Sequence, residues 1–217
     1  MATVKPVRIS LTTFCRTTKM SFIAKRVFDI LSSLIALVIF SPILMIISIW
    51  IALDSRGGIF YRQIRVGKNQ KEFGLYKFRS MRSYSDKAGQ ITIGNDSRIT
   101  KVGEFIRKFK IDEIPQLINI IKGDMSVVGP RPEVPKYVKM YSAEQLNVLT
   151  VLPGLTDYAS IEYLDEQKIL GAADDPDKAY IEEVMPAKLK LNLKYIADRS
   201  FWLDIKLIFR TIGKIIR

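Results

Sequence analysis

The sequence has no histidine among its 217 residues and a single cysteine, Cys15. The missing histidine excludes Ser-His-Asp triads, Cys-His pairs, histidine general bases and histidine-ligated metals. The single cysteine excludes an internal disulfide and a cysteine-based zinc cluster. Any acid, base or nucleophile must therefore be Asp, Glu, Lys, Tyr, Ser, Thr or Cys15. The lack of disulfides also fits a working part that faces the cytoplasm.

Negative charge is scarce, because 34 Lys and Arg residues face only 22 Asp and Glu residues, for a net charge of +12. Such an excess indicates a polyanionic partner: nucleic acid, anionic lipid headgroups or a phosphorylated substrate. The chain has no glycine-rich phosphate loop of the P-loop or dinucleotide-binding type. Phosphate recognition of those two kinds is therefore not expected.

Residues 30–53 form an uncharged run between Asp29 and Asp54, and about 20 apolar residues are enough to span a bilayer. Ser41-Pro42 interrupts the middle of the run. Proline lacks an N–H and clashes with the carbonyl four residues back, so the helix must kink there. The Ser41 hydroxyl can satisfy backbone groups that the kink frees.

Two membrane arrangements fit this run. Basic residues flank the run on both sides, so the positive-inside rule does not determine how the helix is oriented in the membrane. A re-entrant helix that enters, bends at Ser41-Pro42 and leaves by the same face would keep both flanks in the cytoplasm. Each limb of about 12 residues would measure ~18 Å, too short to cross ~30 Å of hydrocarbon. An ordinary spanning helix with a proline kink is the alternative, and the sequence does not decide between them.

The remaining patterns predict a mainly helical domain. Residues 59–66 and 72–81 flank a Gly-Lys-Asn-Gln turn and read as a short β-hairpin, with Lys77 and Arg79 on the face opposite the aromatic residues. Residues 203–217 form an amphipathic helix with a basic stripe, which lies in a membrane interface or packs on its own domain. We therefore expect an α+β fold divided into an N-terminal tail (1–20), a re-entrant membrane helix (21–55) and a cytoplasmic catalytic domain (56–217) with an interfacial C-terminal helix.

The candidate catalytic stretch is residues 110–133, KIDEIPQLINIIKGDMSVVGPRPE. Asp112 and Glu113 precede an apolar helical pattern that ends at Gly123, where a helix C′ residue belongs. With Asp112 as N-cap, Pro115 falls in the first turn, where its missing N–H costs nothing. A carboxylate at this electropositive helix end is expected to stay ionised. Asp112 can also be a purely structural cap.

Cationic residues surround this stretch. Arg131 lies between Pro130 and Pro132, so it has little backbone freedom left to lose, which suits phosphate recognition. Pro-Arg-Pro can equally be only a stiff loop. Arg107 lies five residues before Asp112 across a helix-to-helix join, so it either points to the same site or lies on the surface.

These features together predict chemistry at a membrane surface, between a water-soluble and a lipid-soluble partner of which one or both carry phosphate. A carboxylate that attacks a phosphoryl group must overcome like-charge repulsion, and cationic side chains or a divalent metal reduce it. Mg²⁺ prefers carboxylate and phosphate oxygens, so Asp112 together with a diphosphate would suffice to bind it.

Several short motifs follow one another along the chain. They are Lys25-Arg26-Val27-Phe28-Asp29, Ser41-Pro42, Tyr76-Lys77-Phe78-Arg79-Ser80-Met81, Ser97-Arg98-Ile99-Thr100, Gly103, Arg107, Asp112-Glu113-Ile114-Pro115-Gln116-Leu117, Lys122-Gly123-Asp124-Met125-Ser126, Gly129-Pro130-Arg131-Pro132 and Pro153-Gly154-Leu155-Thr156. In these motifs the chain, from about Ser21 to Arg217, resembles the small monotopic phosphoglycosyl transferases of the bacterial sugar transferase family.

The resemblance implies a re-entrant helix hinged at Ser41-Pro42 in the bacterial inner membrane, with an active site on the cytoplasmic face. It implies Mg²⁺-dependent transfer of a sugar 1-phosphate from a UDP-sugar to polyprenyl (undecaprenyl) phosphate, with release of UMP. This is the first membrane step of a glycoconjugate pathway such as capsule, exopolysaccharide or lipopolysaccharide synthesis. Membrane lipids are implied partners, nucleic acid is not, and a homodimer is compatible with the resemblance.

The resemblance also assigns roles to particular residues. Asp112 would be the nucleophile, forming a covalent aspartyl phosphosugar intermediate, and a ligand of the metal. Glu113 would be its acid–base partner. Phosphate binding and ordering of the site would fall to Lys77, Arg107 and Arg131, the last framed by Pro130 and Pro132.

One segment departs from the family pattern. Where many relatives continue after Pro-Gly-Leu-Thr with Gly and then Ala-Gln-Val-Asn-Gly-Arg, this chain reads Asp157-Tyr158-Ala159-Ser160-Ile161-Glu162. The arginine usual there is absent, so this loop gives no guide to the sugar, and a scaffold that has lost activity stays open. A membrane-anchored nucleic-acid binder is the other alternative. It would need base-stacking aromatics along a basic groove, whereas the basic residues here lie around Asp112 and near the termini.

Overall fold

The computed structural model describes residues 11–82, 96–163 and 166–215. In chain order the elements are α1 (Leu11–Asp54), β1 (Phe60–Val66), η1 (Lys68–Gln70), β2 (Glu72–Phe78), α2 (Lys101–Lys108), η3 (Ile111–Glu113), α3 (Gln116–Lys122), β3 (Ser126–Val128), α4 (Pro135–Val138), η4 (Gln145–Thr150), β4 (Gly154–Thr156), α5 (Tyr158–Glu162), α6 (Glu166–Gly171), α7 (Pro176–Ala179), η5 (Tyr180–Val184), α8 (Met185–Asp198) and α9 (Phe201–Ile215). The mixture of helices with two small sheets confirms the expected α+β class.

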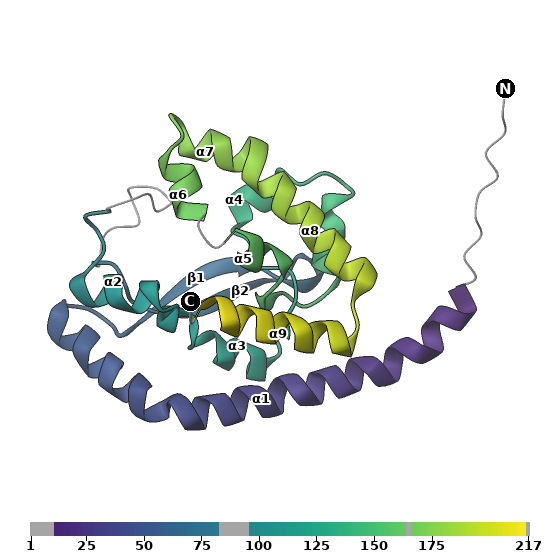
Figure 1. The fold of residues 1–217 in the computed structure, drawn as a ribbon, viewed down its shortest axis with the longest axis horizontal. Coiled ribbons are helices and arrows are strands. Elements are labelled where there is room, and N and C mark those ends of the chain that lie inside the picture. The colour runs from purple at the N-terminus through teal and green to yellow at the C-terminus, as the bar shows by residue number, and fades with distance from the viewer. Residues whose placement is uncertain (1–10, 83–95, 164–165, 216–217) are drawn as a thin grey trace.

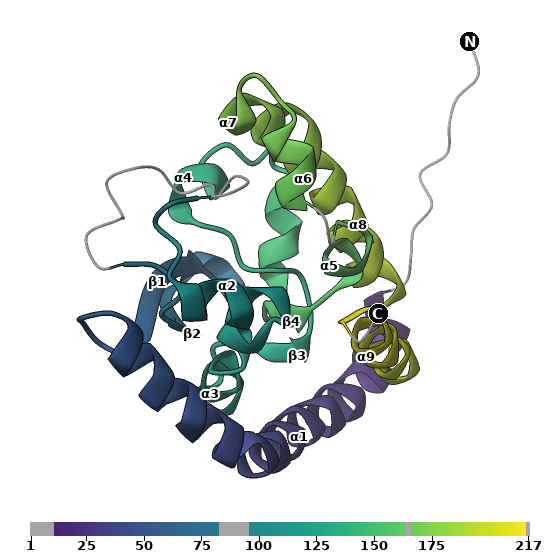
Figure 2. The same cartoon turned by 60° about the vertical axis from the view of Figure 1, so that its left-hand side comes forward.

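Helix α1 extends along one side of the domain, with the other elements gathered above it (Figure 1). It starts at Leu11, inside the segment that the sequence led us to expect as a tail. The helix is continuous through Pro42, and the Ser41 hydroxyl donates to the Val38 carbonyl at 2.7 Å. Figure 2 shows α1 bent into two limbs that meet at an open angle. Where the sequence predicts a re-entrant helix, the structure has one continuous helix with a bend, and its membrane topology stays a prediction.

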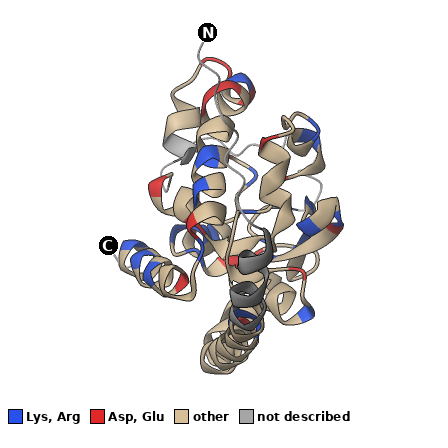
Figure 3. Ribbon diagram, turned by 90° about the vertical axis from the view of Figure 1, so that its right-hand side faces the viewer, with Lys and Arg blue, Asp and Glu red and all other residues tan. Residues whose placement is uncertain are grey.

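From Phe22 to Asp54, most of the α1 surface is apolar and unburied. Val38 and Leu53 are 72% and 81% exposed, and the part of the α1 ribbon that is not grey in Figure 3 is mostly tan, the colour of uncharged residues. Within the described residues, Phe22–Asp54 is the one helix whose length and composition suffice to cross a membrane. An exposed apolar surface of this size marks a membrane or protein interaction site, so α1 is compatible with membrane association.

Polar anchors at the first limb of α1 hold it to the domain. Arg26 donates to the carbonyls of Ile120 (2.6 Å) and Met125 (3.1 Å), at the end of α3. Asp29 is buried and accepts hydrogen bonds from the Ser126 hydroxyl at 2.7 Å and the Val127 amide at 3.2 Å. These bonds fix α1 against the strand that precedes the Gly129–Pro132 loop.

Arg79 anchors the other end of α1. Its guanidinium donates to the carbonyls of Ile51, Ser55 and Arg56, where a cation also complements the negative end of the helix dipole. Arg79 is buried, so its expected place on a charged outer face of the hairpin was wrong. Arg79 is buried because it donates to carbonyls that would otherwise be unpaired at the helix end. The strand pattern around Arg79 does not reveal those carbonyls.

The two sheets are small. Strands β1 and β2 pair antiparallel, with Phe60 opposite Phe78 and Val66 opposite Glu72, which confirms the predicted hairpin. Strands β3 and β4 pair in parallel, and this pairing was not predicted. A Cβ atom added to Gly154 would lie 2.1 Å from the Gly129 nitrogen, so the backbones of the two loops touch and only glycine fits there.

Helix α9 has features of both predicted arrangements, because it packs on its own domain and also exposes apolar side chains that could lie in a membrane interface. Leu207 is fully buried and packs on the domain, whereas Trp202 and Phe209 are 78% and 70% exposed. The helix also bonds to the segment around α5. Thr211 shares a 2.5 Å hydrogen bond with the Thr156 hydroxyl, and Lys214 donates to the Ile161 carbonyl at 2.5 Å.

Candidate active site

The Asp112–Glu113 pair lies in the 3₁₀ turn η3, between α2 and α3. Lys110 precedes this turn in the left-handed region with φ 56°, which is uncommon for a residue other than glycine. Helix α3 starts only at Gln116, with Pro115 as its N-cap. The expectation that Asp112 caps this helix was therefore wrong. The C-terminal prediction is confirmed, because Gly123 ends the helix with φ 95°.

The Asp112 carboxyl is 6% exposed, and its Oδ1 atom has no hydrogen-bond partner within the part of the chain that the structure describes. Burial raises the pKa of Asp112, and Lys77 and Arg107 act against this by favouring the charged form. We expected the helix end to hold this carboxylate ionised, but Asp112 does not cap α3 and burial acts in the opposite direction. Neighbouring cations supply the counteracting charge instead.

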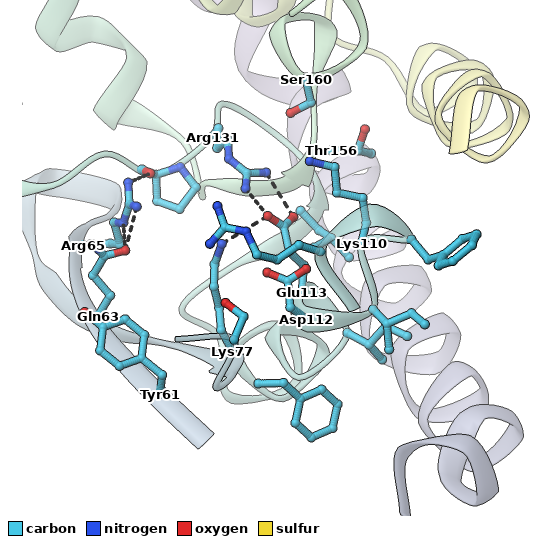
Figure 4. Close-up of a pocket in the computed structure, with 18 of the residues that line it drawn as sticks. Tyr61, Gln63, Arg65, Lys77, Lys110, Asp112, Glu113, Arg131, Thr156 and Ser160 are labelled. Carbon is cyan, nitrogen blue, oxygen red and sulfur yellow. Dashed lines mark hydrogen bonds and ion pairs between the residues drawn. The ribbon is translucent and has the colours of Figure 1, made fainter. Parts of the chain in front are cut away.

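Glu113 forms the centre of a cationic clamp (Figure 4). Lys77 donates to its Oε1 at 3.1 Å, and the Arg131 guanidinium binds both carboxylate oxygens, with Nη1 3.2 Å from Oε2. Burial by itself would raise the pKa of Glu113, but Arg131 and Lys77 outweigh it and hold the pKa well below its usual range. A carboxylate kept ionised in this way holds the two cations in place, and its acid–base role stays a prediction.

Lys77 comes from β2, and its side chain lies beside the Glu113 carboxylate in the close-up (Figure 4). Burial lowers the pKa of its ammonium group, and the negative charge of Glu113 opposes that shift. The ammonium thus depends on Glu113 for a compensating charge. In this clamp the charge of each side chain reduces the free-energy cost of burying the opposite charge of its partner.

Arg131 is fixed through its backbone as well as its side chain. Its amide donates to Asp157 Oδ2 at 3.2 Å. The prolines on both sides contribute carbonyls: the Gly154 amide donates to Pro130 at 2.9 Å, and Arg65 donates to Pro132 at 3.1 Å. Pro130 and Pro132 therefore hold the loop in place through backbone bonds.

A cavity of about 1950 Å³ contains the whole constellation, including Arg107. One part of its wall is apolar and comes from α1, α3, the turn before it, and α9. These residues are Phe28, Ala36, Phe40, Ile114, Leu117, Ile208, Ile212 and Ile215. Another part comes from α4, α5, η5 and α8 and is mixed: Tyr137, Ser160, Tyr180 and Asn192 line it together with the apolar Met185 and Leu189. The acidic pair thus lies in a cavity with one apolar wall and one mixed wall.

Sequence reasoning missed residues that hold the site together. Asn119 is fully buried, and its amide bonds to the Tyr76 N–H and the Gly74 carbonyl, both at 2.9 Å, which ties α3 to β2. A polar residue within the apolar run of α3 was the available signal. Asp157 was noted only as a departure from the family pattern, yet it supports Arg131 and caps α5.

The donor set for a metal is small. No group of three or more His, Cys, Asp or Glu side chains able to hold a metal ion occurs in residues 11–82, 96–163 and 166–215, so far as their side chains are described. Glu113 is already engaged by two cations. Asp112, whose Oδ1 has no hydrogen-bond partner among the described residues, is the carboxylate of the pair that could hold a cation, which fits Mg²⁺ bound mainly through a substrate's phosphates.

Comparison with known proteins places these features in a family. The chain is similar to an Aeromonas hydrophila UDP-N-acetylgalactosamine-undecaprenyl-phosphate N-acetylgalactosaminephosphotransferase, with 38% identity over 88% of this chain and 43% of that protein. A Komagataeibacter xylinus undecaprenyl-phosphate glucose phosphotransferase is 37% identical over 88% of this chain and 35% of its own length. The chain thus spans less than half of these two relatives.

A shorter relative matches almost end to end. The exopolysaccharide production protein PSS of Rhizobium leguminosarum bv. phaseoli is 36% identical over 89% of this chain and 95% of its own length. The model of one family, described as bacterial sugar transferase, matches residues 20–217. That match covers α1 from residue 20 onward and every element of the site, and the chain therefore belongs to the bacterial sugar transferase family.

Proposed function

We propose that this protein transfers a sugar 1-phosphate from a UDP-sugar to undecaprenyl phosphate and releases UMP. The observation that carries the proposal is the buried Asp112 carboxyl with one unpaired oxygen, set beside the Glu113–Lys77–Arg131 clamp. The names of the relatives from Aeromonas and Komagataeibacter describe this type of reaction for those proteins. Family membership and the site geometry support the same reaction here.

The proposed chemistry has two displacements at one phosphorus atom. An Asp112 carboxylate oxygen attacks the phosphorus that bears the sugar, and the bond to the UMP oxygen breaks with its electron pair. The product is an acyl phosphate between Asp112 and the sugar phosphate. A phosphate oxygen of the polyprenyl acceptor then attacks the same phosphorus, which frees the Asp112 carboxylate and leaves a polyprenyl diphosphosugar.

The surrounding cations favour both displacements. Arg131 and Lys77 are held by Glu113 and lie beside Asp112, so they are placed to stabilise negative charge on the reacting phosphates without reorganising. Arg107 lines the same cavity and also favours the ionised form of Asp112. Bound to Asp112 and the diphosphate, Mg²⁺ would neutralise charge on the leaving UMP.

The cavity walls suit the two substrates. The apolar wall formed by α1, α3 and α9 continues toward the exposed apolar surface of α1, so it fits the lipid tail of the acceptor. The mixed wall formed by α4, α5 and α8 contributes polar side chains such as Ser160 and Asn192, which suit the water-soluble donor. A site between these walls would bring both phosphates to Asp112 at the cytoplasmic face of the inner membrane.

The decisive test replaces Asp112 with asparagine in membrane-embedded enzyme supplied with a panel of UDP-sugars and undecaprenyl phosphate. We expect wild type to release UMP and to gain the mass of a sugar phosphate when the acceptor is omitted. Asp112→Asn should do neither. Asp198→Asn, at an exposed position, is the matched control and should behave as wild type. Normal UMP release by Asp112→Asn would refute the proposal.

For the membrane topology we propose the re-entrant form, in which the bend of α1 returns the chain to the cytoplasmic face. A new cysteine at position 2 or 3, in a Cys15→Ser background, should react with an impermeant thiol reagent only after the cytoplasmic side is opened. Labelling from the periplasmic side of intact cells would show instead that α1 spans the membrane.

A further inference from the structure

Four side chains in the cavity wall have an oxygen atom without a hydrogen-bond partner among the described residues: Ser33, Asp112, Ser160 and Asn192. Two of the four belong neither to α1 nor to the acidic pair. They are Asn192 on α8, through Oδ1, and Ser160 on α5, through Oγ; neither atom has a hydrogen-bond partner among the described residues. Asn192 is 4% exposed, and both residues line the cavity that contains Asp112. Buried polar groups in folded proteins are nearly always hydrogen-bonded, so an unpaired pair in one cavity calls for a ligand or another explanation.

Ser160 is connected to the clamp by consecutive hydrogen bonds. Its backbone amide donates to Asp157 Oδ1 at 2.6 Å, and the other oxygen of Asp157 accepts from the Arg131 amide at 3.2 Å. Arg131 in turn binds Glu113, the neighbour of Asp112. Figure 4 shows Ser160 on the far side of Arg131 from Asp112, so it lies beyond the clamp but in the same space.

The chemistry of these two groups suits a neutral ligand. An amide oxygen accepts a hydrogen bond, and a hydroxyl both donates and accepts. The matching ligand presents hydroxyl groups or an amide N–H, as a hexose or an acylamino sugar does. The phosphate of a sugar 1-phosphate is covalently attached to the sugar, so a sugar whose phosphorus lies at Asp112 and Arg131 occupies the same cavity that Ser160 and Asn192 line.

We propose that Ser160 and Asn192 form a sugar-recognition subsite that discriminates among UDP-sugars by bonding to a hydroxyl or acylamino group. This inference rests on the proposed function. It places donor selectivity partly in the segment 157–162, where the sequence departs from the usual family pattern, and partly on α8. Asp157 gives this segment a fixed position relative to Arg131.

The test measures KM and kcat for several UDP-sugars at saturating undecaprenyl phosphate, in wild type, Ser160→Ala and Asn192→Leu. Leucine has nearly the shape of asparagine without its polar atoms, so it separates recognition from packing. For the best sugar we expect each variant to raise KM about tenfold, the scale of one lost hydrogen bond, with kcat changed much less. The ratio of kcat/KM for the best sugar to kcat/KM for the other sugars should become smaller. Competitive inhibition by UMP should stay as in wild type.

Controls keep this inference distinct from the proposed function. Asn147→Leu is an exposed substitution outside the cavity and should leave every KM unchanged. The melting temperature of Asn192→Leu should not fall, because the change removes a buried unpaired oxygen. If wild type turns over a UDP-sugar and both variants keep its sugar preference, the subsite is refuted. A wild-type protein that releases UMP from no UDP-sugar refutes the proposed function instead.

Discussion

Replacing Glu113 with glutamine tests the clamp most directly. The carboxylate is buried between the Lys77 ammonium and the Arg131 guanidinium, and the three side chains are 13%, 20% and 32% exposed. Removing one partner of a buried ion pair costs roughly 3–5 kcal/mol. Because these groups keep some contact with solvent, we expect about 3 kcal/mol, the lower end of that range. For a domain of this size that is a fall in melting temperature of about 6–12 °C.

The effect should depend on pH with a defined sign. Since the pKa of Glu113 is well below its usual range in the folded protein, its contribution is present above the unfolded pKa of about 4.3 and is lost as pH falls through the folded pKa. The stability gap between wild type and Glu113→Gln should therefore be full at pH 7 and shrink in strong acid.

The measurement is thermal unfolding of detergent-solubilised protein between pH 3 and pH 8. The matched control is Glu162→Gln, because Glu162 pairs with Arg210 at 3.8 Å while both side chains are about half exposed. An exposed pair contributes about 0–1 kcal/mol, so this control should barely move the melting temperature. If Glu113→Gln melted within about 1 °C of the control at pH 7, the clamp would not hold the site together.

Three further changes probe the charge around Asp112, the contact between the β3 and β4 loops, and helix α9. Since Glu113 raises and Arg107 lowers the pKa of Asp112, the acidic limb of the pH–rate profile should move to lower pH in Glu113→Gln and to higher pH in Arg107→Gln; shifts in one common direction would contradict this. Gly154→Ala should unfold or inactivate the protein, because its Cβ would lie 2.1 Å from a backbone nitrogen. Gly213→Ala, which meets nothing within 4 Å, should instead stabilise α9 by up to ~1 kcal/mol, and circular dichroism melts would compare the two.

The sequence predicted local elements well where one pattern determines them. The β1–β2 hairpin follows from alternation around a polar turn, and the end of α3 at Gly123 follows from a glycine at a left-handed position. Lys77, Asp112, Glu113 and Arg131 were selected from short motifs, and the structure brings them together in one cavity. Their catalytic roles remain proposals.

What the sequence did not predict depends on contacts between distant segments. The start of α3 at Gln116 moved Asp112 from a helix cap into a buried 3₁₀ turn, which reversed the expected direction of its pKa shift. Arg79 is buried because carbonyls at the end of α1 need donors. The parallel β3–β4 pair joins strands about 28 residues apart, and no local sequence pattern predicts such a pairing.

The bonds between α9 and its neighbours bear on how members of this family could be recombined. Thr211 binds Thr156, just before the segment 157–162, and Lys214 binds the Ile161 carbonyl inside it. If that segment alone were grafted into a relative, the hydrogen bonds that Thr211 and Lys214 of α9 make here would be lost. The smallest transplantable unit is therefore the segment plus the C-terminal helix, and chimeras built on that boundary should fold where shorter exchanges fail.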